Sequence, residues 1–167
     1  KQATRPDAPL CTGNPINAGT GGKFESLEIY KGGGSFPLLF ASSYYSRPDS
    51  QGGIFSEVGA YWSSTYDRKV SMLDNSTYWS SFLRRADGRG LVFTKSTPTE
   101  LVHDGDIVDN LRRITDPSIS WEATNPEDEL ETYGAQGQLL TITNRAGLRQ
   151  FLNYDGQSRL SAVVDHF

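Results

Sequence analysis

The segment Tyr133-Gly134-Ala135-Gln136-Gly137-Gln138-Leu139 recurs as Tyr154-Asp155-Gly156-Gln157-Ser158-Arg159-Leu160, at an offset of 21 residues. The match continues beyond the leucines, where Ile142 aligns with Val163 and Asn144 with Asp165. A short fixed period predicts an elongating β structure whose units bury their apolar faces only against neighbouring units. The repeat therefore favours an architectural or interaction role over a compact active site.

The residue types within each unit suggest separate structural roles. A tyrosine at a strand end can bury its ring against the adjacent strand and keep its hydroxyl on backbone or water. The Gly/Asp/Asn segment that follows permits a positive φ in the connecting turn, and the leucine then re-enters the core. We therefore expect each unit to form one strand–turn–strand rung, with rung positions at Tyr133, Leu139, Tyr154 and Leu160.

Composition places the chain in a broad class. Its 167 residues suffice for one domain with a real core. Seventeen glycines, eight prolines, eight tyrosines and eight phenylalanines favour strands and turns over helices. We expect an all-β fold, a curved antiparallel sheet, open or curled, that leads into the repeats.

Charge and hydropathy exclude two kinds of partner. The net charge of −4 gives no attraction to nucleic acid phosphates or to anionic lipid. No apolar run approaches the ~18 residues of a membrane span. We therefore expect no nucleic acid partner and no membrane insertion.

Alternation and turn signals divide the chain into elements. Asp87-Gly88 between two apolar runs predicts a hairpin, and 106–114 fits either a strand or a single helical turn. The expected organisation is an extended arm over 1–15, a β domain over 16–128 and two repeats over 129–167, the second incomplete. Strands are expected at 23–30, 36–45, 61–72, 78–85 and 90–95, with a loop at 47–53.

Four further segments form a recognisable series with the repeats. They are Gly13-Asn14-Pro15-Ile16-Asn17-Ala18-Gly19-Thr20-Gly21-Gly22-Lys23, Tyr44-Tyr45-Ser46, Trp62-Ser63-Ser64-Thr65-Tyr66-Asp67-Arg68, and Arg85-Ala86-Asp87-Gly88-Arg89 followed by Phe93. In this order they resemble the Rhs (rearrangement hotspot) or YD-repeat proteins, in particular the segment that opens the repeat region. Two departures are Tyr61, where the family usually has Gly, and Gly134, which replaces the Asp of the Tyr-Asp pair.

The resemblance implies a structural role. Proteins of this family are large, secreted or surface-displayed bacterial proteins whose repeats coil into a hollow β shell, which in many members encloses a toxin. By resemblance, this segment belongs to the shell wall or its cap and carries no catalytic residue. Its partners would be further repeats of the same chain or identical chains, and a toxin cargo. Gly13, Pro15 and Asn17 are expected to shape the opening turn, and Trp62, Tyr66 and Trp121 to be buried.

Candidates for chemistry are few. Cys11 is the only cysteine, which excludes an internal disulfide and a cysteine-based metal site. Paired with His103 it could act as a nucleophile, or it is a plain thiol. Asp104-Gly105-Asp106 with Asp109 lacks the glycine and distal Glu of a calcium loop and reads as a solvated acidic turn. We predict no catalytic residue, cofactor or metal.

Other charged groups are interpreted as surface features. Glu127-Asp128-Glu129 with Glu131 is expected to be a charged loop or an edge that discourages strand pairing. The pairs Arg84-Arg85 and Arg112-Arg113 are expected on solvated strand faces.

A band of aromatic residues leaves two functions open. Such residues fill a sparse β core, or they form a surface that binds sugar rings or a partner. The alternative function is therefore a stand-alone extracellular fibre subunit or adhesin that binds carbohydrate or partner chains through aromatics and sheet edges. An exposed groove lined by Trp62, Tyr66 and Trp79 would favour binding, and burial under another strand would favour the shell. The band comprises Tyr44, Tyr45, Phe55, Tyr61, Trp62, Tyr66, Tyr78 and Trp79.

Overall fold

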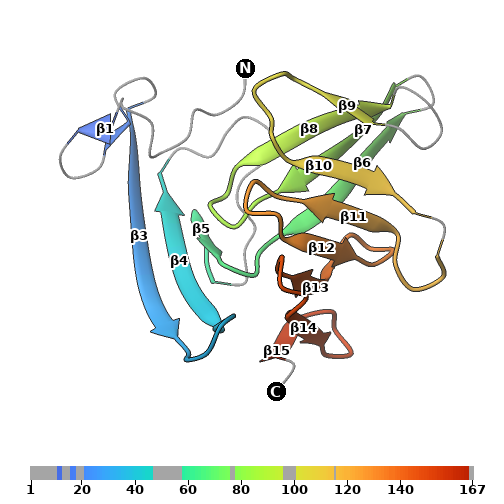
Figure 1. The fold of residues 1–167 in the computed structure, drawn as a ribbon. Helices are drawn as coiled ribbons and strands as arrows, with labels where there is room; N and C mark the ends of the chain where they lie inside the picture. Colours follow the sequence, from blue (N-terminus) through green and yellow to red (C-terminus); the bar gives the residue numbers. More distant parts are fainter. Residues whose placement is uncertain are drawn as a thin grey trace.

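Three antiparallel β-sheets make up the fold in a computed structural model of the chain (Figure 1). The structure describes residues 11–12, 16–17, 21–46, 58–75, 78–95, 101–114 and 116–165, with backbone alone at 11, 12, 17, 73–75, 78, 79 and 95. These residues form strands and turns and include no helix. The described part of the chain therefore has no helix that could cross a membrane. The all-β prediction is confirmed, and none of the three sheets closes into a barrel.

Each sheet is a meander in which consecutive strands pair. The N-terminal sheet contains β1 (Cys11–Thr12), β2 (Ile16–Asn17), β3 (Gly22–Lys31), β4 (Leu39–Tyr45) and β5 (Trp62–Ser64). The middle sheet contains β6 (Lys69–Asn75), β7 (Tyr78–Arg84), β8 (Gly90–Lys95) and β9 (Leu101–His103). The C-terminal sheet contains β10 (Asn110–Arg113), β11 (Trp121–Thr124), β12 (Leu130–Tyr133), β13 (Leu139–Thr143), β14 (Arg149–Tyr154) and β15 (Leu160–Asp165).

Two predicted elements differ from the observed ones. The single strand expected over 61–72 is two strands, β5 and β6, separated by a turn in which the Ser64 N–H donates to Asp67 Oδ2 at 2.7 Å. The ambiguous segment 106–114 contributes a strand, β10, rather than a helical turn. The C-terminal sheet also runs across residue 128, because β11 and β12 pair on either side of it. The expected loop at 47–53 lies outside the described residues.

One turn geometry recurs in five described hairpins. In each, the first residue's N–H donates to the fifth residue's carbonyl, and the fourth residue's N–H donates to the first residue's carbonyl. The fourth residue always has a positive φ, as in a three-residue hairpin loop that closes with a left-handed residue. The 21-residue unit therefore contains two strands and two turns, not the single expected rung. The first and fourth residues are Arg85 and Gly88, Asn125 and Asp128, Gly134 and Gly137, Asn144 and Gly147, and Asp155 and Ser158.

Side chains reinforce these turns. The Oδ1 atoms of Asn125, Asn144 and Asp155 each accept the backbone N–H groups two and four residues further on. This arrangement fixes the turn locally and explains why Asx residues recur there. Gly134 has no side chain to do this, and Gln138 takes over part of the role because its Oε1 accepts the Gln136 N–H at 3.1 Å.

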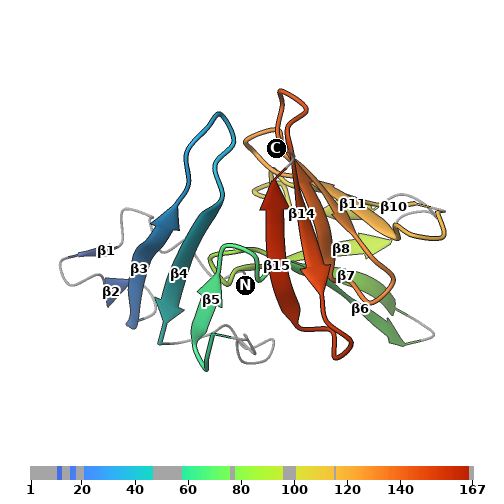
Figure 2. The same ribbon diagram turned by 90° about the horizontal axis from the view of Figure 1, so that it is seen from below.

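The main core lies between the middle and C-terminal sheets (Figures 1 and 2). Val70, Leu83 and Phe93 of the middle sheet pack with residues of the C-terminal sheet, including Trp121 and Tyr133. The two sheets also meet directly through backbone, because Val70 N–H donates to the Gly137 carbonyl at 2.9 Å and Lys69 bridges Gln138. A Cβ on Gly137 would lie 1.7 Å from the Val70 carbonyl oxygen. The repeat's glycine is therefore required by sheet packing as well as by its φ of 75°.

Substitutions at the equivalent turn positions of the two repeats, Gly137 and Ser158, should have opposite effects on stability. Ser158 has a φ of 62°, a conformation that costs a side-chain-bearing residue about 1–2 kcal/mol. Part of this cost is offset because glycine is more flexible in the unfolded chain. We expect Ser158→Gly to raise the free energy of unfolding by about 0.5–1 kcal/mol, and Gly137→Ala to lower it by about 3 kcal/mol or more. Urea unfolding of both variants checks this, and similar effects at the two positions would contradict the packing argument.

Candidate functional site

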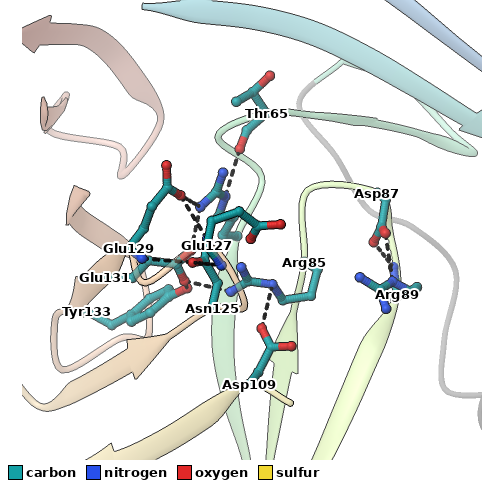
Figure 3. A network of polar contacts seen from close by, with 11 residues as sticks. Thr65, Arg85, Asp87, Arg89, Asp109, Asn125, Glu127, Glu129, Glu131 and Tyr133 are labelled. Atoms are coloured by element: carbon teal, nitrogen blue, oxygen red, sulfur yellow. Dashed lines mark hydrogen bonds and ion pairs between the residues drawn. The ribbon is translucent and has the colours of Figure 1, made fainter. Parts of the chain in front are cut away.

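A cluster of charged side chains is buried between the middle and C-terminal sheets (Figure 3). Its centre is Glu131 on β12, whose carboxylate is fully buried. This carboxylate accepts hydrogen bonds from Arg68 Nη1, from Arg85 Nη1 at 2.7 Å, and from the Tyr133 hydroxyl. A buried charge is tolerable only when it is paired and hydrogen-bonded, and here one carboxylate has three donors.

Three separate parts of the chain deliver these donors. Arg68 comes from the turn between β5 and β6, where its Nε also donates to the Thr65 carbonyl at 3.1 Å. Arg85 opens the Arg85–Arg89 hairpin between β7 and β8, and Tyr133 shares the inward face of β12 with Glu131. At the rim, Glu129 lies 3.7 Å from Arg68 Nη1 and accepts a hydrogen bond from Asn125 Nδ2.

The electrostatics show which groups stay ionised. Burial by itself would raise the pKa of Glu131, but the guanidinium groups of Arg68 and Arg85, together with the hydrogen bonds it accepts, bring that pKa below its ordinary value. Burial raises the pKa of Tyr133, and the neighbouring Glu131 charge raises it further. The cluster therefore holds a carboxylate, two guanidinium groups and a neutral phenol.

Asp109 is a less favourable member of the cluster. Its Oδ1 lies 3.2 Å from Arg85 Nε, close enough for an ion pair, although the orientation makes no hydrogen bond. Burial raises the pKa of Asp109 despite the nearby arginines, which lower it. The Asp109 charge is thus a net cost to the folded state.

A second polar junction joins the N-terminal sheet to the C-terminal sheet. The Tyr66 hydroxyl accepts the Leu39 N–H at 3.3 Å and lies 3.4 Å from Gln150 Oε1, to which it donates. Gln150 Nε2 donates to the Pro37 carbonyl at 3.1 Å. Since Thr65 Oγ1 also accepts the Ala41 N–H, the turn between β5 and β6 contacts the N-terminal and C-terminal sheets and leads directly into the middle sheet.

A groove of about 440 Å³ lies beside this junction. Phe40 and Val58 come from the N-terminal part, and Lys69 and Arg84 come from the middle sheet. The end of β5 and the turn after it contribute Ser64, Tyr66, Asp67 and Arg68, and the remaining wall comes from turns and strand ends of the C-terminal sheet. Its size falls in the range of ligand pockets. The wall from the C-terminal sheet comprises Gln136, Gln138, Tyr154, Ser158 and Leu160.

The residues singled out from the sequence lie in different environments. Tyr66, Trp121, Tyr133 and Leu139 are buried, and Tyr154 and Leu160 are partly exposed against the core. Trp62 was expected to be buried, but it is only partly so, because its short strand β5 ends the N-terminal sheet and its ring packs on Tyr44 at 5.2 Å. Gly13, Pro15 and Phe55, and the side chains of Asn17, Tyr78 and Trp79, lie outside the described residues. Of the three residues expected to line a groove, Tyr66 lines the one described above and Trp62 does not, and the Trp79 side chain lies outside the described residues.

Two surface predictions were wrong. Arg85 was expected on a solvated face and Glu131 in a charged loop or edge, yet both are buried and paired with each other. The burial of Glu131 could have been predicted from the alternation of side chains along a strand. Glu131 lies two residues before Tyr133 and therefore on the same face of the strand. No comparable signal existed for Arg85, whose partner lies 46 positions away. Arg112 and Arg113 are exposed as predicted, as are Asp104 and Asp106, whereas Asp109 is buried.

Metal binding finds no support in the described residues. Within the ranges given above, no group of three or more His, Cys, Asp or Glu side chains could hold a metal ion. His103 is exposed on β9, with Nδ1 2.9 Å from the Asp104 carbonyl oxygen. The Cys11 side chain lies outside the described residues, so a Cys11–His103 pair is not tested.

Part of the chain matches a known protein family. Residues 13–93 match the family model described as a domain of unknown function, DUF6531. No curated protein matches the chain. The DUF6531 region spans slightly less than half of the sequence, and it contains Arg68 and Arg85 but ends before Asp109, Glu131 and Tyr133. The buried cluster is thus a joint between the DUF6531 region and the C-terminal sheet.

The arrangement is suited to holding sheets together. The oxygens of Glu131 are occupied by donors from the protein itself, and a fully buried carboxylate is inaccessible to a substrate. What the geometry provides is an orientation-specific contact between segments far apart in the sequence.

Removing the central charge should destabilise the fold strongly. Glu131→Gln removes the buried counter-ion that Arg68 and Arg85 share and leaves them only the more distant Glu129 and the poorly oriented Asp109. Breaking a buried ion pair by removing one partner typically costs about 3–5 kcal/mol. The matched control is Glu122→Gln on the neighbouring strand. Its partner Arg112 is exposed and Glu122 is partly buried, so loss of this ion pair should cost less than about 1 kcal/mol. Urea unfolding measures both, and equal losses would contradict a special role for Glu131.

Acid should act on the cluster in two opposing ways. Since the folded pKa of Glu131 is lowered, its stabilisation is complete above the ordinary carboxyl pKa of about 4 and is lost as pH falls through the folded value. Since the folded pKa of Asp109 is raised, its protonation on acidification relieves a cost instead. We expect Asp109→Asn to unfold with a steeper loss of stability between pH 7 and pH 4 than the unmodified chain, as measured by urea titrations at several pH values. A shallower dependence would show that the Asp109 charge is favourable.

Proposed function

We propose that this chain is a structural, non-catalytic β segment of a secreted or surface-displayed protein of the Rhs/YD-repeat type, contributing to a shell or cap around cargo such as a toxin. The proposal joins the sequence resemblance to the DUF6531 match over residues 13–93. It assigns the N-terminal and middle sheets to the segment that opens the shell and the C-terminal sheet to the first repeats.

The observation that carries the proposal is the C-terminal sheet itself. Four of its five connections use the same hairpin turn, so the sheet can lengthen by repetition without new turn chemistry. The sheet ends at β15, which pairs on one side with β14 and has no partner on its other side among the described strands. A repeat array from the same or an identical chain would pair along this edge.

The buried cluster supports the same function. A shell wall needs rigid joints between sheets, and the Glu131 cluster supplies one between the DUF6531 region and the repeats. Its charges are directed at one another, as in a structural joint.

One observation favours the second candidate, a fibre subunit or adhesin that associates through its edges. Leu27, Ile29 and Tyr30 are exposed on β3, and β2 pairs with that strand only at Gly22 and Lys23. The remaining outer edge of β3 has no described partner, and an exposed apolar edge strand is a template for pairing with another chain.

The mass of the natural protein separates these two functions. An antibody raised against the 167-residue chain would be used to probe source cells and culture medium by immunoblot, with surface exposure assessed by protease treatment of intact cells. We expect a surface or secreted species many times heavier than 18.4 kDa. A natural product of about this mass would contradict the shell assignment and favour the subunit.

A further inference from the structure

The groove beside Tyr66 reaches the start of β15. This strand is the last one of the C-terminal sheet (Figure 2), and its outer edge has no partner among the described strands. Leu160, which opens β15, and Ser158, in the turn before it, both line the groove. A strand that pairs with β15 would therefore place one of its ends over this groove. The residues that line the groove then determine which side chain of that strand could occupy it.

The first repeat provides a template for that strand. Leu139 opens β13, and β14 pairs with β13 in the register Thr141 to Phe151 and Ile142 to Gln150. At the end of β14, the Tyr154 hydroxyl donates to the Leu139 carbonyl at 2.8 Å. Leu160 is the equivalent of Leu139, 21 positions later. The residue whose carbonyl is equivalent to the acceptor of Tyr154 thus lines the groove.

The walls of the groove fit an aromatic side chain with a polar tip. Phe40, Tyr154 and Leu160 are partly exposed and pack against the core on their inner side. Gln136 and Ser158 add an amide and a hydroxyl to the lining, and Asp67, Arg68, Lys69 and Arg84 add charged groups. A tyrosine buries its ring against such apolar walls while its hydroxyl finds an acceptor.

We propose that this groove is a socket for the tyrosine of a β-strand that pairs with the open edge of β15, with the strand following the pattern of β14. The ring fills the space between Phe40, Tyr154 and Leu160, and the hydroxyl donates to the Leu160 carbonyl. The inference rests on the proposed function, because it names the chemistry of the strand that extends the sheet. Main-chain pairing provides general affinity, and the tyrosine fixes the register.

The test uses a fluorescent peptide that copies Leu148 to Gly156 and the 167-residue chain, with binding followed by fluorescence anisotropy. We expect saturable binding that a scrambled peptide of the same composition does not show. Tyr154→Phe in the peptide copy removes one hydrogen bond and should weaken binding about two- to tenfold. Tyr154→Ala in the peptide copy should weaken it more than tenfold. Equal binding of the scrambled or Tyr154→Ala peptide would overturn the proposal.

Matched variants of the chain locate the site. Gln136 and Gln157 occupy the same position in the turns of the two repeats, and only Gln136 lines the groove. We expect Gln136→Trp to fill the groove and reduce peptide affinity at least tenfold, and Gln157→Trp to change it less than twofold. Leu160→Gln is the second variant if Gln136→Trp fails to fold. Unchanged binding by a folded groove variant would overturn the assignment.

The outcomes also separate this inference from the proposed function. Groove-dependent binding together with a natural product of 18.4 kDa would support the socket and refute the shell. A large natural protein whose isolated segment shows no tyrosine-dependent binding would refute the socket alone.

Discussion

The burial of one carboxylate constrains much of this structure. Glu131 lies in the inward row of the C-terminal sheet, opposite Ala123 on one side and Ile142 on the other. An unpaired charge there would be prohibitive, so Arg68 and Arg85 must both reach it. Arg68 fixes the turn between β5 and β6, and Arg85 fixes the hairpin between β7 and β8. The relative placement of the middle and C-terminal sheets thus depends on a contact that tolerates little error in geometry.

A second constraint is local and repeated. The same hairpin turn closes five connections, and its requirements are modest: an acceptor near the first position and a residue that tolerates positive φ at the fourth. Where Gly134 lacks the acceptor, Gln138 supplies one. Where Ser158 stands in place of glycine, the turn persists under strain. Because this turn accepts different residues at its first and fourth positions, it can recur along the sheet while the sequence varies.

The C-terminal sheet is anchored at an inner strand and ends at β15. The Glu131 cluster on β12 joins the sheet to the region that matches DUF6531, whereas β15 has no partner on its outer side among the described strands and lies beside the groove. In the proposed shell, the cluster would hold the sheet in place and β15 would be the strand at which the sheet lengthens. The tyrosine positions differ accordingly, since Tyr133 is enclosed by the anchor and Tyr154 lies at the margin of the groove.

The sequence by itself determined the local features of this protein. Turn residues and alternation depend on nearby positions, so the all-β class, the Asp87-Gly88 hairpin and the extent of β8 could be predicted. The period of 21 indicated a repeat, although its division into two strands and two turns was not apparent. Tertiary structure alone decided that Arg85 and Glu131 are buried, because each charge is acceptable only beside a partner far away in the chain. It also decided that the groove forms from three sheets, since no local pattern brings Phe40, Lys69 and Leu160 together.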